Sequence, residues 1–134
     1  MTVVSTVLAC IFLSAVVLGF LTLAAVVPVR AANGADPTRG KELFEKRCGG
    51  CHSLNADKEG PRLGNVYGRR SGTISTFKYS GALKSSSTLW DANSLDKWLT
   101  NTESVIPDND MDFRVPKPEE RADIIEYLRV TSGK

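Results

Sequence analysis

One short motif carries most of the chemistry that this sequence could perform: Cys48-Gly49-Gly50-Cys51-His52, with two of the three cysteines and the only histidine. The histidine directly follows the second cysteine of a Cys-x-x-Cys pair, which is the spacing at which c-type haem is attached. Two thiols can add to the haem vinyl groups as thioethers, and the adjacent imidazole then reaches the iron. The motif predicts a covalent haem c bound through Cys48 and Cys51, with His52 as an iron ligand.

A Cys-x-x-Cys pair can also serve three other purposes. A thioredoxin-like redox pair should follow a strand–helix–strand pattern, which this sequence does not show. A zinc site would need two further ligands, and the chain after Arg30 has no other cysteine or histidine. A tight disulfide beside a bystander histidine is the remaining alternative.

The second axial position of such an iron decides between electron transfer and chemistry at the metal. Apart from Met1 the chain has one methionine, Met111, and it lies in the polar stretch 106–112, Ile-Pro-Asp-Asn-Asp-Met-Asp. A single methionine usually fills a hydrophobic core, but this stretch offers no core to recruit it. We therefore expect Met111 to be the second ligand, which closes the iron to oxygen and raises the reduction potential by favouring Fe(II).

Three helices are predicted to position these residues. The first is capped by Asp36 and leads into the cysteines, the second starts at Asn93, and the last begins near Pro118 and ends before Gly133. Gly40 faces inward on the first helix, so the last helix can cross it closely. The inward faces carry Leu43, Phe44, Leu95, Trp98, Leu99, Ile124, Ile125, Tyr127 and Leu128.

Between Ser53 and Asp91 the sequence shows no convincing helix or alternating strand. A loop of that length normally argues against a compact domain, but a large apolar cofactor would supply the missing core. The predicted fold class is all-α, with three to five helices and long loops around one covalent haem, over residues 36–134.

The N-terminal segment is a separate unit. No charged side chain occurs from Thr2 to Val29, a run longer than the roughly eighteen apolar residues that can span a bilayer. Residues 1–31 are therefore expected to form an apolar helix, either an uncleaved membrane anchor or a signal peptide, followed by the short linker 32–35. Both alternatives place the domain outside the cytoplasm, in the periplasm. Cys10 would lie within the membrane segment.

Charge excludes one class of partner. The formal net charge is +2, and basic and acidic residues alternate along the chain. Nucleic-acid-binding proteins normally show a clustered basic face, so no nucleic-acid partner is expected. We expect a monomer.

Further short segments on both sides of the haem motif belong to a recognisable pattern. They are Gly40 and Phe44, Gly60-Pro61-Arg62-Leu63, Tyr67-Gly68-Arg69-Arg70-Ser71-Gly72, Phe77-Lys78-Tyr79, Trp90, the trio Leu95, Trp98 and Leu99, and Pro107 four residues before Met111. With these residues the sequence from about Asp36 to Arg129 resembles class I cytochrome c, the single-haem family that includes mitochondrial cytochrome c. The resemblance implies the small cytochrome c fold and an electron-transfer function.

The same resemblance implies roles for residues around the haem. The carbonyl of Pro61 would accept the N–H of the His52 imidazole and so orient the ring. The others would contact the haem propionates or line the methionine side: Arg69, Tyr79, Trp90, Trp98 and, in place of the family's hydroxyl donor, Asn109.

Three departures from the family pattern bear on function. Residues 108–110, Asp-Asn-Asp, replace the family's Gly-Thr-Lys, and Trp98 stands where the mitochondrial form has a tyrosine that touches the methionine sulfur. Glu103, Ser104 and Asp110 replace lysines that ring the mitochondrial haem edge. Docking to the strongly acidic site of mitochondrial partners is therefore not expected.

The predicted function is one-electron transfer, without enzyme activity, between extracytoplasmic respiratory partners. These would be a quinol-oxidising complex, a dehydrogenase or a terminal oxidase. One alternative is a fixed haem subunit of a larger membrane redox enzyme, which the short linker 32–35 would favour by holding the domain near the membrane. A haem peroxidase, the other alternative, would need an open coordination position on the iron.

Overall fold

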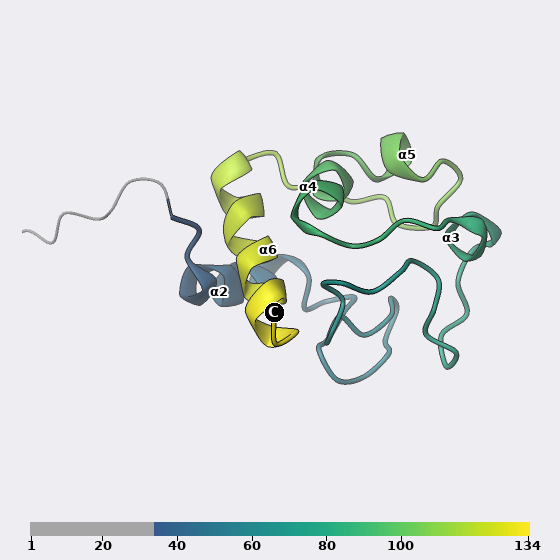
Figure 1. The fold of residues 1–134 in the computed structure, drawn as a ribbon, viewed down its shortest axis with the longest axis horizontal. Coiled ribbons are helices and arrows are strands. Elements are labelled where there is room, and N and C mark those ends of the chain that lie inside the picture. The colour runs from purple at the N-terminus through teal and green to yellow at the C-terminus, as the bar shows by residue number, and fades with distance from the viewer. Residues whose placement is uncertain (1–33) are drawn as a thin grey trace, which may run out of the picture. The chain divides into compact units, whose positions relative to one another are not determined.

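The computed structural model describes residues 34–134, so the predicted anchor or signal and residues 32–33 of the predicted linker lie outside this part. The described residues form five helices, which Figure 1 labels. They also form one isolated antiparallel bridge, between Arg70 and Leu89. The helices are α2 (Pro37–Arg47), α3 (Gly81–Ser85), α4 (Ala92–Thr100), α5 (Thr102–Val105) and α6 (Pro118–Thr131). This confirms the predicted all-α fold with long loops. Within residues 34–134 no helix has the length and apolar character needed to cross a membrane.

Helix α2 begins and ends as the sequence predicts. The Asp36 carboxylate accepts the N–H groups of Thr38 and Arg39, and Pro37 occupies the first turn, where its missing N–H costs nothing. At the other end, the N–H of Cys48 donates to the carbonyl of Phe44 at 2.8 Å. The helix therefore delivers the chain directly into the cysteine motif.

Helices α2 and α6 pack closely where Gly40 meets Asp123. A Cβ on Gly40 would collide with the Asp123 carbonyl, so only glycine permits this approach. The fully buried Asp123 carboxylate pairs with Arg39 and accepts the N–H of Asp36 at 2.8 Å. Next to this contact the rings of Phe44 and Tyr127 lie 5.5 Å apart. The contact fixes the start of α2 against the middle of α6.

Helix α4 starts at Ala92, one residue before the predicted Asn93. The reason is a capping box, in which the Asp91 carboxylate accepts the N–H of Ser94 while the Ser94 hydroxyl accepts the N–H of Asp91, both at 2.8 Å. Its buried face, Leu95, Trp98 and Leu99, is the predicted one.

A buried guanidinium links α4 to α6. Arg121 donates through Nε to Asp96 on α4 at 2.7 Å, and through Nη1 to the carbonyl of Val115 at 3.0 Å. Pairing with Asp96 and bonding to the backbone satisfy a charge that would otherwise be costly to bury.

The two shortest helices were not predicted. The Ser80 hydroxyl accepts the N–H of Leu83 at the start of α3, and the Asn101 amide oxygen accepts the N–H groups of Glu103 and Ser104 at the start of α5. Helices of four or five residues contain little more than one turn, so no apolar period marks them in the sequence.

Candidate functional site

A cavity of about 560 Å³ brings together the residues with the predicted chemistry. Cys48, Cys51, His52 and Met111 all line it. Most of the remaining lining is apolar, including Phe44, Leu63, Val66, Leu95, Trp98, Leu99, Ile124 and Leu128. The volume falls within the range of about 300–1,000 Å³ that is usual for cofactor sites.

The cysteine motif forms a turn that continues from α2. The N–H groups of Cys51 and His52 both donate to the carbonyl of Cys48, at 3.1 and 2.8 Å. Cys48 is buried and Cys51 exposed, and both are free thiols, not a disulfide. Burial raises the pKa of the Cys48 thiol to about 11, so this group is protonated at neutral pH.

The His52 ring is held in one orientation by Pro61. The imidazole Nδ1 lies 2.7 Å from the Pro61 carbonyl oxygen, which can only accept, so Nδ1 carries the proton and Nε2 keeps a free lone pair. Burial, the largest influence, lowers the pKa of His52 and favours the neutral ring that metal binding requires. The contact predicted for Pro61 is present.

Met111 lies in the loop between α5 and α6, half-buried against the core. Its N–H donates to Oδ1 of Asn109 at 2.8 Å, and its carbonyl accepts the hydroxyl of Thr102 at 2.6 Å. Hydrogen bonds on both sides of its Cα thus fix the backbone of Met111.

Arg69, Tyr79 and Trp90 also line this cavity. The N–H of Trp90 donates to the Arg69 carbonyl at 2.9 Å, next to the bridge between Arg70 and Leu89. Burial raises the pKa of Tyr79, which keeps its hydroxyl protonated as a donor. The structure therefore gathers the three predicted propionate donors on one cavity.

Trp98 and Asn109 differ in their placement. Trp98 lines the cavity on α4 and packs against Trp90 with ring centroids 5.2 Å apart. Asn109 does not belong to the lining, because its amide nitrogen donates to Glu103 and to the Ile106 carbonyl. In this geometry Asn109 bonds to the loop that carries Met111.

Three residues make contacts at the site that the sequence did not predict. Gly60 packs so closely on His52 that a Cβ would lie 2.7 Å from both ring nitrogens. Thr102 and Glu103 hold the loop around Met111. The Gly-Pro pair at positions 60 and 61 was the available signal for the first, whereas the other two lie in the unpredicted helix α5.

The donor set fits a c-type haem. The free thiols of Cys48 and Cys51 lie on the same cavity as the neutral imidazole of His52, whose Nε2 is free. Met111, which carries a thioether, lines this cavity too. Imidazole and thioether together are the axial pair of electron-transferring haem proteins. An apolar lining suits the macrocycle, and the lining also includes Arg69, whose guanidinium donates to the carbonyls of Gly64 and Arg62 at 2.9 and 3.1 Å.

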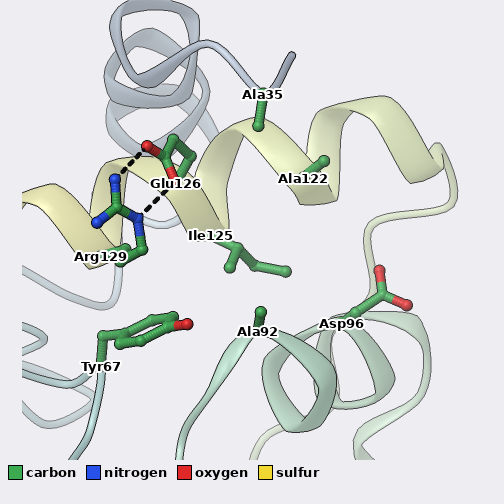
Figure 2. Close-up of a pocket in the computed structure, with 8 residues that line it drawn as sticks. All are labelled: Ala35, Tyr67, Ala92, Asp96, Ala122, Ile125, Glu126 and Arg129. Carbon is green, nitrogen blue, oxygen red and sulfur yellow. Dashed lines mark hydrogen bonds and ion pairs between the residues drawn. The ribbon is translucent and has the colours of Figure 1, made fainter. Parts of the chain in front are cut away.

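A second pocket, of about 310 Å³, contains none of these residues (Figure 2). Three alanines, Ile125 and Tyr67 line it, together with Asp96 and the ion pair of Glu126 with Arg129. It has no thiol, imidazole or thioether, so the larger cavity is the candidate site.

Comparison with known proteins identifies the family. The sequence matches the family described as Cytochrome c over residues 37–132. It is 35% identical over 106 residues to cytochrome c of Guizotia abyssinica, covering 76% of this chain and 96% of the relative. It is 41% identical over 102 residues to cytochrome c 2.1 of Caenorhabditis elegans, covering 74% and 92%.

A solved structure gives the same result for the fold. Cytochrome cH from Methylobacterium extorquens superposes with a TM-score of 0.67 at 32% sequence identity, covering 71% of this chain and 98% of that one. The chain therefore belongs to the cytochrome c family, whose members are electron carriers with covalently bound haem c.

Proposed function

We propose that the chain carries one haem c, bound by Cys48 and Cys51 and ligated by His52 and Met111, and passes single electrons between respiratory proteins outside the cytoplasm. The observation that supports this most directly is the presence of all four side chains on one cavity. When bound, the haem supplies a reversible one-electron couple between its two iron oxidation states.

His52 contributes a fixed and neutral nitrogen donor. Its Nδ1 proton is committed to the Pro61 carbonyl, so Nε2 is free to bind iron without losing a proton. Gly60 leaves no room for the ring to move toward it. Such outer contacts commonly fix the orientation of a metal-binding histidine.

Met111 contributes the thioether that would close the second axial position. A site with both positions filled favours electron transfer over oxygen or peroxide chemistry. This is the reason for preferring a carrier to a haem peroxidase.

The charged edge of the haem would face Arg69, Tyr79 and Trp90. A guanidinium, a phenol hydroxyl and an indole N–H can each donate to a carboxylate. All three side chains line the cavity. Donation to both propionates would hold the macrocycle in place and offset the cost of burying negative charge.

The proposed partners are a quinol-oxidising complex, a dehydrogenase or a terminal oxidase, which the protein would meet as a monomer. Location in the periplasm rests on the uncharged run from Thr2 to Val29, which is long enough to span a bilayer. If that run stays attached, the protein is either a tethered carrier or a fixed subunit of a larger enzyme.

Visible and near-infrared spectra of the purified protein test the haem assignment. The ferric wild type should be low-spin, show the sulfur-to-iron charge-transfer band and not bind carbon monoxide readily when reduced. Met111→Ala should lose the band, become substantially high-spin and bind carbon monoxide. Met111→His should remain low-spin with a potential lower by about 0.1–0.3 V, within the roughly 0.8 V range set by axial ligands.

A matched control removes an apolar side chain elsewhere. Val130 is exposed on α6 and does not line the cavity, so Val130→Ala should leave the spectra unchanged. Ready carbon monoxide binding by the wild type would reject Met111 as the ligand and favour the peroxidase alternative.

Cell fractionation tests the proposed location. An anchored protein should stay in carbonate-washed membranes at its full-length mass. Recovery in the soluble periplasm with a mature N-terminus near Ala32 would instead show a cleaved signal. Recovery from the cytoplasm with haem attached would contradict the proposal.

A further inference from the structure

The loop that carries Met111 contains no helix or strand. From Ile106 to Lys117 the backbone runs without regular secondary structure, between the end of α5 and the start of α6. Asp108 in this loop has a φ of +59°, a conformation that most residues with a side chain avoid. Backbone hydrogen bonds hold only its two ends, from the N–H of Ile106 to the Thr102 carbonyl and from the N–H of Val115 to the Leu99 carbonyl, so side-chain contacts must maintain the part around Met111.

Glu103 supplies two of these contacts from the first turn of α5. One carboxylate oxygen accepts the N–H of Asp108 at 3.0 Å, and the other accepts Nδ2 of Asn109 at 3.2 Å. The first bond holds the residue in the unfavourable backbone conformation. The second determines where the Asn109 side chain lies.

Asn109, held by Glu103, in turn holds the backbone of Met111. Its Nδ2 also donates to the Ile106 carbonyl at 2.9 Å, while its Oδ1 accepts the N–H of Met111 at 2.8 Å. Only one orientation of the amide satisfies both acceptors and the donor. The Glu103 carboxylate therefore fixes Asn109, and Asn109 fixes the backbone of Met111.

We propose that Glu103 and Asn109 form a positioning clamp that keeps the Met111 thioether available to the haem iron and slows its replacement by other ligands. The inference rests on the proposed function, in which Met111 is the second axial ligand. Neither residue touches the iron in this scheme. Each acts through the backbone of the loop, as outer contacts do in metal sites where their loss commonly changes affinity or activity by 10–100-fold.

Near-isosteric substitutions separate the clamp from general stability. Asn109→Asp keeps the acceptor for Met111 but places a carboxylate oxygen against Glu103 and the Ile106 carbonyl, where a donor is required. Glu103→Gln keeps one acceptor oxygen for two donors, and Glu103→Ala keeps none. The clamp predicts a graded effect in which Glu103→Gln is milder than Glu103→Ala.

Asp108→Asn is the matched control. It removes one negative charge from the same loop, the side chain of Asp108 forms no hydrogen bond within residues 34–134, and asparagine tolerates a positive φ. An effect in the Glu103 variants that comes only from the lost negative charge would appear in this variant as well.

The experiment measures the rate of cyanide binding to the ferric holoprotein and the sulfur-to-iron charge-transfer band, with thermal unfolding recorded separately. Relative to wild type, Glu103→Ala and Asn109→Asp should bind cyanide about 10–100-fold faster and show a weaker band. Asp108→Asn should stay within about twofold, as expected for an exposed change. The double variant Glu103→Ala with Asn109→Ala should show less than the combined effect of the two single variants, because one of the two Glu103 contacts acts through Asn109.

Three outcomes would overturn the clamp. If the wild type shows the band and Glu103→Ala and Asn109→Asp leave cyanide binding unchanged, Met111 is the ligand but the clamp is wrong. If Asp108→Asn accelerates cyanide binding as strongly as Glu103→Gln, charge and not hydrogen bonding is responsible. If the wild type lacks the band, the ligand assignment in the proposed function fails first and the clamp falls with it.

Discussion

Gly60 and His52 are in direct contact, with no space between them for even one more carbon atom. A Cβ on Gly60 would stand 2.7 Å from both ring nitrogens of His52. The next residue, Pro61, accepts the Nδ1 proton of the same ring. Two neighbouring residues thus fix both the position and the tautomer of the imidazole.

Gly60→Ala should therefore displace His52. The ring would have to shift, which as an overpacking change costs about 1–3 kcal/mol and weakens the bond to Pro61. We expect a lower thermal midpoint and an altered spectrum in the purified holoprotein. Gly34→Ala is the control, because a Cβ there meets nothing within 4 Å and the residue lies outside the haem motif and the cavity lining. Equal behaviour of the two variants would show that the contact with His52 does not matter.

Gly40→Ala should destabilise the crossing of α2 and α6. Alanine is favoured over glycine inside a helix by about 1 kcal/mol, so a net loss would identify the collision with the Asp123 carbonyl as the cause. We expect a loss of about 1–3 kcal/mol in denaturant unfolding. Gly81→Ala, at an open position of α3, should stay within about 0.5 kcal/mol of wild type. A stabilised Gly40→Ala would refute the close approach.

Acid should weaken a loop contact made by Asp57. The backbone N–H of Arg62 and the hydroxyl of Thr76 donate to this carboxylate and hold the pKa of Asp57 below its ordinary value of 3.8. Because the folded-state pKa is the lower one, the stabilisation is complete above about pH 4 and is lost as pH falls through the folded-state value.

Unfolding of wild type and Asp57→Asn across this pH range tests the contact. The wild type should be more stable at pH 7, and the difference should shrink on acidification below pH 4. Glu42→Gln, on the exposed side of α2, should show no such convergence with wild type. A difference between wild type and Asp57→Asn that stays constant with pH would contradict the assignment.

Electron transfer to an acceptor with a strongly acidic docking site, such as mitochondrial cytochrome oxidase, should be slow and weakly dependent on salt. Glu103 and Asp110 put negative charge near the loop of Met111, so attraction cannot steer such an encounter. Asp110→Lys should accelerate transfer at low salt and make it salt-sensitive. Glu42→Lys, with the same charge change on α2, should do less. Fast wild-type transfer that collapses with added salt would refute this prediction.

Much of the fold could be predicted because its signals are local and repeated. The Asp36 cap, Pro118 in the first turn of α6 and the apolar faces of α2, α4 and α6 are such signals, and the structure confirms them. The start of α4 was misplaced by one residue because the capping box at Asp91 and Ser94 was not recognised. Helices α3 and α5 were missed because one turn shows no period.

The site was predictable where the sequence offers only one candidate of the required residue type. His52, Cys48, Cys51 and Met111 stand out because the chain after residue 31 has no competing histidine, cysteine or methionine. Asn109 was expected at the cofactor, but its amide is used within its own loop. Such choices depend on which donors and acceptors the folded loop brings within 3 Å, and the sequence alone does not contain that distance.

The contact between Gly40 and Asp123 also determines how freely chain length can vary in this domain. Helices α2 and α6 lie at opposite ends of the domain sequence, so their pairing closes everything between Arg47 and Pro118 into a single loop. The entropy of closing a loop grows only with the logarithm of its length, and doubling it costs about 0.6 kcal/mol. A few residues gained or lost on the surface between His52 and Ser80 therefore change stability far less than one methyl group at the crossing.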